Sequence, residues 1–597
     1  MQTIRLADYV TTFLADFGVD TAFMLTGGFA MHLNDALAQE SRINKICCHH
    51  EQACALAAEA YAHVRHRPAL VQITAGPGVT NALTGVYSAF VDGLPMLVIC
   101  GQVKRELLRA ARSLENLRQI GEQEVDSVAL ARPVTKYAQR ILEPEHVKYE
   151  LGKALYIASA GRPGPVWLEI PLDVQAALIE PAGLPSFRLP LLPPPDLSGI
   201  AASVARKLER AKRPLLVAGP DLHMDEATDD FLRLAEKCAW PVVCAGVLDI
   251  VQREHPLYAG AMGAVGNRAG NIAMQNADVI LFLGVAMHTT FTTYNWQAMG
   301  RNAHKIVVEP EFSECERPQW LGDESIICRP GEFIRALDKE LATLQNTAGT
   351  SWLDFCRERV RLLPPVPERL RSITPEGRIN PYWFAEELFK RLGNADIVTP
   401  GNATAGITAQ QAGSLRPGQR LLANFGCGPM GYALPAATGA AVAGKGRRVI
   451  CLDGDGSFML NMQELATIKY HKLPIIIFIY NNNGYASIRQ SQQNFFTARL
   501  GYGPENGLCF PDFVAVAQAF GLPAIKINGR NFQSALELVL QKRGPFLAEV
   551  LLDAEQGFEP KIASRKLPDG RMASIPPENM HPFLSEEELQ THLLCKL

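Results

Sequence analysis

The stretch Val449-Ile-Cys-Leu-Asp-Gly-Asp-Gly-Ser457 decides the fold of this chain. Its apolar half, residues 449–452, has strand length and runs directly into Asp453-Gly454-Asp455-Gly456-Ser457. A second apolar run, residues 474–480, leads in the same way into Asn481-Asn482-Asn483-Gly484. Continuous apolar strands separated by an amphipathic helix are typical of a parallel sheet covered on both faces. Such sheets bind ligands beyond the carboxyl ends of their strands, so both polar segments are predicted to lie at one ligand-binding edge.

The oxygen atoms at this predicted edge suit a hard divalent cation. The carboxylate of Asp455, the side-chain amide oxygen of Asn482 and the backbone carbonyl of Gly484 are ligands of the kind that Mg²⁺ prefers. Gly454 and Gly456 would let the backbone approach a diphosphate at a helix N-terminus. The alternative is two unrelated turns, since Asp-Gly and Asn-Gly are common turn dipeptides.

Two proline-rich stretches, at 181–195 and 362–367, divide the 597 residues into blocks. The predicted domains are 1–180, 196–345 and 368–560, followed by a tail at 561–597. Each block alternates short β-branched runs with longer amphipathic stretches, which predicts an α/β fold of three doubly wound parallel-sheet domains in series. The expected strands include 69–74, 96–100, 215–218 and 279–283, and a helix is expected over 51–64.

The composition excludes several classes of protein. Lys plus Arg number 58 against 61 Asp plus Glu, so no basic face for nucleic acid is expected. No apolar run is long enough to span a membrane, and no signal pattern opens the sequence. The thirteen scattered cysteines fit a reducing compartment, so a cytoplasmic protein is expected.

The spacing of the two polar segments resembles the signature of thiamine-diphosphate enzymes. Gly454-Asp455-Gly456 is followed, after a 24-residue gap, by Asn481-Asn482. The resemblance implies that Asp455, Asn482 and Gly484 hold Mg²⁺ against the diphosphate of the cofactor. It further assigns to cofactor binding a set of residues from the third block: Asn402, Ala403, Thr404, Gly454, Gly456, Ser457, Tyr485, Ala486 and Ser487.

Gly426-Cys-Gly428-Pro-Met430-Gly431 fits a dinucleotide-binding fingerprint, G-x-G-x-x-G. That interpretation needs a strand leading directly into the glycines, and residues 421–425 form a poor strand because they contain Asn424. The resemblance implies another role: Met430 bends the thiamine, and the Gly428 carbonyl accepts a hydrogen bond from its aminopyrimidine. Met430 as core filler is the plain alternative.

Glu51 opens an alanine-rich helix after His49-His50. A lone glutamate there is usually a favourable partner of the helix dipole. The resemblance instead matches it to the catalytic glutamate that activates the pyrimidine, and it matches Thr26, Thr74, Pro77 and Asn81 to the surrounding pocket. Relatives bind the cofactor between the first domain of one subunit and the third of another. The resemblance therefore implies a homo-oligomer, which is at least a dimer, and it favours a tetramer.

Within the family, the chain most resembles acetolactate synthases and their carboligase relatives. The resemblance places Gly28 and Phe29 near the reacting carbon and Gln123 on the acceptor side. Segments 262–266 and 275–278 match those that hold FAD in that branch, although residues 284–290 lack the expected arginine. Departures occur at four positions: Phe29, Glu122, Leu172 and Ser491. With Ile488, Ser491 is expected to shape the substrate pocket, and the departures together favour a changed acceptor.

Tyr294-Asn295-Trp296 and the tail segment Asn579-Met-His-Pro-Phe-Leu584 resemble the YerE-like carboligases of branched-chain sugars, which implies FAD as a non-redox cofactor. The tail could form an active-site lid. The expected activity is decarboxylation of pyruvate or 2-oxobutyrate and transfer of the acyl unit, through a cofactor-bound enamine, to an aldehyde or ketone. The alternatives are acetolactate synthase proper, a simple 2-oxo acid decarboxylase, a flavin-dependent pyruvate oxidase and a catalytically silent homologue.

Overall fold

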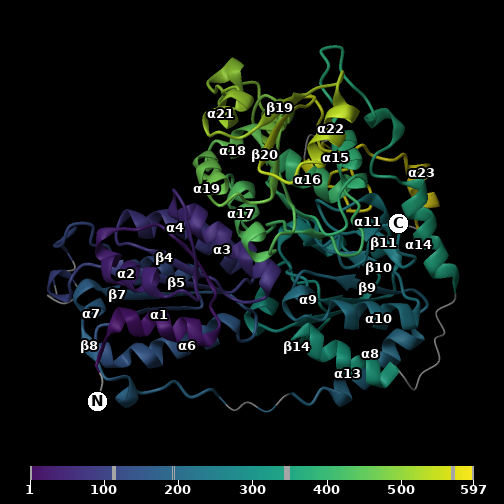
Figure 1. Cartoon of the computed structure of the whole chain (residues 1–597). Helices are drawn as coiled ribbons and strands as arrows, with labels where there is room; N and C mark the ends of the chain where they lie inside the picture. Colours follow the sequence, from purple (N-terminus) through teal and green to yellow (C-terminus); the bar gives the residue numbers. More distant parts are fainter. Residues whose placement is uncertain are drawn as a thin grey trace.

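Three six-stranded sheets, one after another along the chain, organise the molecule (Figure 1). The computed structural model describes residues 3–109, 114, 116–190, 193, 195–341, 350–566 and 572–594. Every neighbouring pair of strands within the three sheets is parallel, and helices cover both faces. The predicted α/β fold with three doubly wound sheets is thereby confirmed. None of the helices in these ranges combines the length and apolarity needed to cross a membrane.

The first sheet orders its strands as second, first, third, fourth, sixth, fifth. In space these are β3 (Asn44–Cys47), β2 (Thr21–Met24), β4 (Leu70–Ile73), β5 (Met96–Gln102), β7 (Pro165–Pro171) and β6 (Tyr137–Arg140). The accompanying helices are α1 (Leu6–Phe17), α2 (Met31–Gln39), α3 (Glu51–Arg65), α4 (Pro77–Val91), α5 (Ser127–Ala131), α6 (Val147–Ser159) and α7 (Leu172–Gln175). A short antiparallel pair, β1 (Ile4–Arg5) with β8 (Leu178–Ile179), ties the beginning of this unit to its end.

The middle sheet has the order 3-2-1-4-5-6 that is typical of dinucleotide-binding folds. Its strands are β11 (Tyr258–Ala261), β10 (Val242–Cys244), β9 (Pro214–Ala218), β12 (Val279–Leu283), β13 (His304–Glu309) and β14 (Glu324–Ile327). Its helices are α8 (Ser198–Arg210), α9 (Asp221–Met224), α10 (Thr228–Cys238), α11 (Arg268–Asn276), α12 (Thr289–Thr292) and α13 (Pro330–Leu341), and α14 (Thr350–Leu362) leads towards the third unit.

The third sheet repeats the strand order of the first. Its strands are β16 (Arg420–Leu421), β15 (Ile397–Pro400), β17 (Val449–Gly454), β18 (Ile475–Asn481), β20 (Phe546–Leu551) and β19 (Ala524–Ile527). Its helices are α15 (Pro381–Lys390), α16 (Ala403–Ala412), α17 (Ala433–Ala443), α18 (Asp455–Phe458), α19 (Leu465–Tyr470), α20 (Ala486–Phe495), α21 (Phe513–Ala519) and α22 (Phe532–Leu540). The strand order of the first sheet and that of the third sheet therefore reverse at equivalent points, between β2 and β4 and between β15 and β17. Each such point is called the direction change of its sheet.

Helix α3 joins the first unit to the third (Figure 1). It lies between α4 and α17, and the three helices meet through alanines and glycines. A Cβ atom on Gly439 of α17 would overlap the carbonyl oxygen of Ala57, and one on Gly85 of α4 would lie 2.5 Å from the Cβ of Ala55. Small residues are required here because the backbones approach too closely for larger ones.

The tail lies against the middle unit. It contains β21 (Ser564–Lys566), β22 (Met572–Ser574) and α23 (Glu586–Thr591). Arg268 of α11 donates hydrogen bonds to the carbonyls of Met580 (2.6 Å) and Pro582 (2.5 Å). Asn276 at the end of α11 donates to the carbonyl of His592 at 2.9 Å. This arrangement fixes the tail on α11, and a lid role for it stays a prediction.

Candidate active site

A cavity of about 610 Å³ lies at the carboxyl edge of the third sheet. This volume is within the range of small-molecule sites, roughly 300–1,000 Å³. The cavity opens where β15, β17 and β18 end, beside the direction change of the sheet. It is lined by Asn402, Ala403, Thr404, Met430, Gly454, Asp455, Gly456, Ser457, Asn482, Gly484, Tyr485, Ala486, Ser487, Ile488 and Gly501. The sequence-predicted metal and diphosphate residues are thus brought together.

Asp455 and Asn482 line the same cavity, as a shared cation site would require. The Asp455 carboxylate accepts backbone N–H bonds from Gly456 (2.7 Å) and Gly484 (2.9 Å), and burial raises its pKa to about 6. Asn482 donates through Nδ2 to Thr404 at 2.9 Å, which leaves its Oδ1 buried without a partner. An unsatisfied buried oxygen is costly. Because it stands beside a buried carboxylate, these residues fit Mg²⁺.

The glycines around this site are required by close approaches. A Cβ atom on Gly456 would overlap the ring of Tyr485, and one on Gly484, where φ is 132°, would overlap the carbonyl oxygen of Tyr502. No heavy atom lies within 4 Å of the Cβ position of Gly454. The backbone of Gly454 is therefore open to a ligand, and these residues fit a diphosphate beside the cation.

The turn around Gly428 belongs to the same cavity. Asn402 donates through Nδ2 to the Gly428 carbonyl at 3.1 Å, and the Gly431 N–H donates to Ser457 Oγ at 2.8 Å. These bonds connect the turn to the residues after β15 and β17. Met430, which the sequence analysis matched to the residue that bends the cofactor, lines the cavity between them.

Glu51 lies in a second cluster, at the carboxyl edge of the first sheet. It is the first residue of α3, its side chain is buried, and Oε2 accepts a hydrogen bond from Asn81 Nδ2 at 3.0 Å. Pro77 opens α4 next to it, and a Cβ atom on Gly78 would lie 3.3 Å from Glu51 Oε1. The hydroxyl of Thr74 is buried without a partner. One unpaired polar atom, the Thr74 hydroxyl, therefore lies in the cluster around this carboxyl group.

The loop of residues 26–29, with Thr26 and Gly28 exposed, lies beside this cluster. A Cβ atom on Gly27 would lie 2.5 Å from the side chain of Thr74. The Phe29 carbonyl accepts a hydrogen bond from Gln175 Nε2 at 2.8 Å, and its backbone packs against Gly101 at the end of β5. Phe29 is therefore placed at the sheet edge that also carries Glu51.

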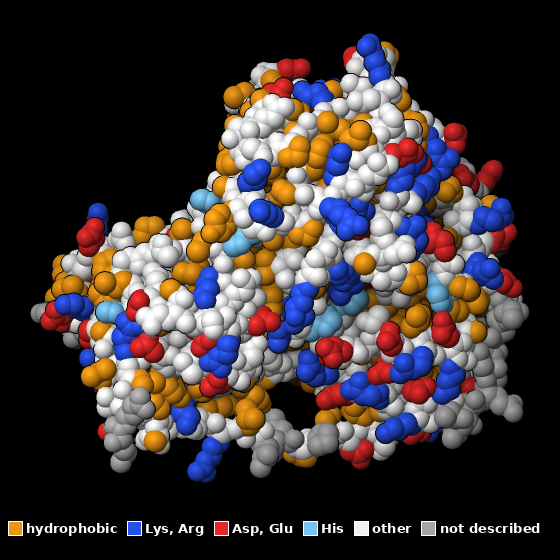
Figure 2. Space-filling view, in the orientation of Figure 1, with side chains coloured by type: hydrophobic (Ala, Val, Ile, Leu, Met, Phe, Trp, Pro, Cys, Tyr) orange, Lys and Arg blue, Asp and Glu red, His pale blue; other side chains and the backbone are white. Residues whose placement is uncertain are grey.

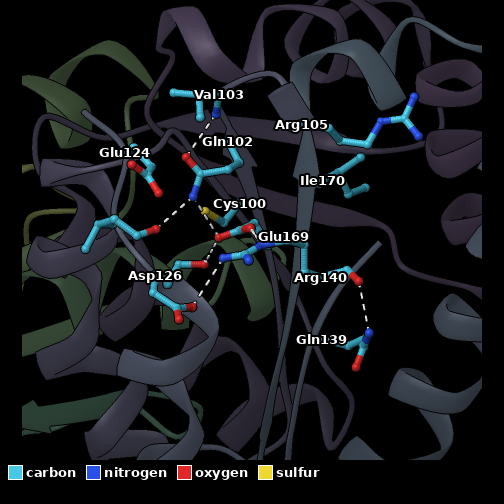
Figure 3. Close-up of polar contacts among 12 residues, drawn as sticks. Cys100, Gln102, Val103, Arg105, Glu124, Asp126, Gln139, Arg140, Glu169 and Ile170 are labelled. Atoms are coloured by element: carbon cyan, nitrogen blue, oxygen red, sulfur yellow. Dashed lines mark hydrogen bonds and ion pairs between the residues drawn. The ribbon is translucent and has the colours of Figure 1, made fainter. Parts of the chain in front are cut away.

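Gln123 lies next to Gly76 at the same edge, and a buried polar network around Gln102 and Glu169 lies in the same unit (Figure 3). The Gln123 backbone has a left-handed conformation, φ 61°, and a Cβ atom on Gly76 would lie 2.8 Å from its carbonyl oxygen. Gln102 of β5 donates to the Val125 carbonyl at 2.8 Å and to Glu169 Oε2 at 2.9 Å. The fully buried Glu169 carboxylate also accepts from Arg140 and Ser127.

The sequence analysis did not single out Glu169. A glutamate inside the apolar strand Val166-Trp-Leu-Glu-Ile170 was the available signal, because a buried carboxylate needs partners. Glu122 is exposed, and Glu124, one residue after Gln123, is buried and accepts from the backbone N–H groups of Arg109 (2.8 Å) and Ile120 (3.0 Å). Glu124 therefore stabilises the conformation of the loop that carries Gln123.

The cavity on the third sheet does not include the residues of the second cluster. Every residue lining the 610 Å³ cavity belongs to 402–501, and neither Glu51 nor Gln123 is among them. Of the two residues predicted to shape the substrate pocket, Ile488 lines this cavity, whereas Ser491, one turn further along α20, is outside the lining and donates to the Ser487 carbonyl at 2.9 Å.

The carboxyl edge of the middle sheet is closely packed where a dinucleotide such as FAD would be expected. At its direction change, β9/β12, the three units meet and leave about 40 Å³, far below the roughly 300 Å³ at which small-molecule sites begin. The lining comes from all three units: His63, Asp92, Arg162, Pro220, His223, Gly246, Val247, Ala286, His288, Phe291, Arg420, Leu421, Ala423 and Phe425. A Cβ atom on Gly246 would lie 2.7 Å from the rings of both Phe291 and Phe425.

Segment 262–266, which the sequence analysis matched to an FAD-binding segment, is packed against protein. A Cβ atom on Gly263 would overlap the Thr290 carbonyl, and one on Gly266 would overlap that of Ala261. The crevice that this strand order offers to dinucleotides is thus filled by side chains, and no flavin is assigned to it.

Such a fold, with residues that fit a cation and a diphosphate on one sheet and a buried glutamate on another of equal strand order, is typical of a cofactor-dependent α/β enzyme. Three family models of thiamine pyrophosphate (thiamine diphosphate) enzymes match this chain. The model of the N-terminal cofactor-binding domain matches residues 4–130, that of the central domain matches 201–337, and that of the C-terminal cofactor-binding domain matches 401–550.

Acetolactate synthases are among the similar proteins. The isozyme 1 large subunit of Escherichia coli K12 is 30% identical over 93% of this chain and 95% of its own length. Acetolactate synthase 3 of Brassica napus, a chloroplastic protein, is 29% identical over 94% and 85%, and the chloroplastic enzyme of Arabidopsis thaliana is 28% identical over 94% and 83%. The chain belongs to the thiamine pyrophosphate enzyme family.

Proposed function

We propose that this enzyme decarboxylates a small 2-oxo acid, pyruvate or 2-oxobutyrate, and transfers the acyl unit to an aldehyde or ketone. The observation that carries the proposal is the presence of both cofactor half-sites: Asp455 with the unpartnered Asn482 oxygen, and the buried Glu51. The similarity to acetolactate synthases, which extends over most of the chain, supports carboligation.

Each half-site has a task in this proposal. Asp455, Asn482 and the Gly484 carbonyl would hold Mg²⁺ and the diphosphate, while the Gly428 carbonyl and Met430 would orient the pyrimidine. When bound, the cofactor supplies the carbon centre that takes up the acyl unit. Glu51 would exchange a proton with the pyrimidine nitrogen, and the bond from Asn81 holds its carboxyl group in place at 3.0 Å.

The proposed assembly is a homodimer or a tetramer built from such dimers, in which the first domain of one copy covers the third domain of the other. The cavity lining supports this arrangement, because residues 402–501 alone leave the catalytic carboxyl outside. Figure 2 shows acidic and basic side chains interspersed over the visible face, without one large field of either sign. Since the sequence as a whole also has 58 Lys and Arg against 61 Asp and Glu, we propose small-molecule substrates and no nucleic acid.

The acceptor is proposed to be larger than a free 2-oxo acid. Ile488, 44% exposed, lines the cavity, and the small side chain of Ser491 lies one turn further along α20, just outside the lining. Phe29 would add an aromatic wall from the partner copy. Acetyl transfer to a ketone, as in the YerE-like branch, is the specific form of this proposal.

Product analysis by NMR tests the proposal. Purified protein is incubated with thiamine diphosphate, Mg²⁺ and pyruvate, with and without a ketone, and Glu51→Gln serves as the matched control. The expected result is a tertiary alcohol that joins the acetyl group to the added ketone, a product distinct from acetolactate and absent in the control. Acetaldehyde as the dominant product with excess ketone would refute carboligation, and acetolactate alone would refute the enlarged acceptor.

A further inference from the structure

Glu59, two helical turns after Glu51 on α3, is a fully buried carboxyl group that the proposed chemistry does not use. Its Oε1 accepts a hydrogen bond from Asn424 Nδ2 at 2.8 Å, and its Oε2 has no partner. Burial, reinforced by the nearby Asp92, raises the pKa of Glu59 to about 8. The group is therefore mainly neutral at pH 7.

Asn424 in turn shapes the turn that carries Gly428. Its Oδ1 accepts the backbone N–H groups of Cys427 (3.1 Å) and Gly428 (2.6 Å), while Nδ2 donates to Glu59 and to Ser88 Oγ (2.7 Å). With both amide hydrogens accepted by α3 and α4, the oxygen of Asn424 is directed at the turn. Gly428 itself has φ 56°, a left-handed conformation that glycine adopts without a steric penalty.

Asp92, at the end of α4, holds the same turn from the other side. Its carboxylate accepts from the N–H groups of Phe425 (3.3 Å) and Gly426 (3.0 Å). A Cβ atom on Gly426 would lie 2.6 Å from Asp92 Oδ1, so the first glycine of the G-x-G pattern is required by this approach. The pattern therefore serves a contact between units, in place of a dinucleotide.

We propose that Glu59 is a positioning residue: by anchoring Asn424 it fixes the Gly428 turn, and with it the carbonyl group and Met430, for the pyrimidine of the cofactor. The inference rests on the proposed function, because it concerns the same cofactor site. It assigns to the middle of α3 a role in the half-site of its own chain, separate from that of Glu51.

Calorimetric affinity for thiamine diphosphate with Mg²⁺ is the primary test. Glu59→Leu removes the acceptor, and we expect the Kd to rise about tenfold, the effect of one buried hydrogen bond. Glu59→Gln keeps an acceptor oxygen without charge and is expected to stay within about twofold of the wild type. Asn424→Ala should weaken binding at least as much as Glu59→Leu, and the double variant no further than Asn424→Ala, because Glu59 acts through Asn424.

Two readouts are independent of catalysis. In the protein without cofactor, hydrogen exchange of the peptide around residues 424–430 should be faster in Glu59→Leu and Asn424→Ala and unchanged in Glu59→Gln. In the wild type the Kd should rise above about pH 8, because the ionised Glu59 carboxylate would repel that of Asp92, which holds the same turn. This pH-dependent rise in Kd should be absent in Glu59→Gln. The other titratable groups facing the turn, Cys427 and Tyr432, both have raised pKa values and stay neutral in that range.

Additive losses in the double variant, or unchanged affinity and exchange in Glu59→Leu, would overturn the inference. If Glu59→Leu fails to fold, the comparison of Asn424→Ala, Glu59→Gln and the wild type still decides it. A wild-type protein that binds no thiamine diphosphate would refute the proposed function itself, and the positioning role with it. Normal wild-type binding with indifferent variants would refute only the positioning role.

Discussion

Two inactive variants of this enzyme should restore activity when they are combined in one dimer. Glu51→Gln disables the first-domain half-site, and Asp455→Asn disables the third-domain half-site. In a single chain these residues belong to separate clusters, since the cavity at Asp455 is lined only by residues 402–501. If each complete site joins two copies, a mixed dimer contains one site with both defects and one with none.

The magnitude follows from this arrangement. Equal co-expression gives mixed dimers in about half of the population, and half of their sites are intact, so about a quarter of wild-type activity is expected. Purification through a different affinity tag on each variant should raise this to about half, against parents reduced by about 10²-fold or more. Pyruvate consumption with saturating cofactor is the assay. Mixed dimers as inactive as their parents would refute a site shared between copies.

Three further predictions concern the rest of the chain. Burial lowers the pKa of His63 to about 3 from 6.5, so on acidification the unfolded state takes up a proton before the folded state does. The free energy of unfolding should therefore be unaffected by this group above about pH 6.5 and lower by about 2 kcal/mol at pH 5. Urea unfolding at pH 7 and 5 measures this, and an equal loss in His63→Gln would contradict it. Gly439→Ala, which forces a methyl group against Ala57, should cost about 1–3 kcal/mol in thermal or urea unfolding. Gly199→Ala, with no atom within 4 Å, is the control and should be neutral or stabilising. Purified protein, finally, should show no flavin absorbance and no FAD binding by calorimetry, and stoichiometric flavin would contradict the filled middle crevice.

The sequence predicted the strands best where the apolar runs are continuous. Residues 279–283 coincide with β12, and 215–218 differ from β9 by one residue. Strand β5 extends beyond the expected residue 100 to Gln102, because the polar end pairs with Ile170 and Pro171 of β7. A buried polar residue such as Gln102 is tolerated in a strand when its side chain has a hydrogen-bond partner. That partner, Glu169, comes 67 residues later in the sequence.

The gathering of Asp455, Asn482 and Gly484 around one cavity was predictable because these residues follow neighbouring strands at a fixed spacing. The anchoring of the Gly428 turn was not. Glu59 and Asn424 are 365 residues apart, and their hydrogen bond depends on how α3 packs against α17. The only local sign was a carboxyl group in the middle of an alanine-rich helix, a position that costs free energy unless a partner is present.

The three units also meet through charge. Asp92 of the first unit accepts N–H groups from the third, and beside it Arg162 lies 3.8 Å from Glu309 and 3.6 Å from Glu314 of the middle unit. Unfolding any one unit would break these contacts and expose the surfaces that they join. The consequence is cooperativity: the three domains gain their stability jointly, so damage to one of them lowers the resistance of the whole chain to unfolding.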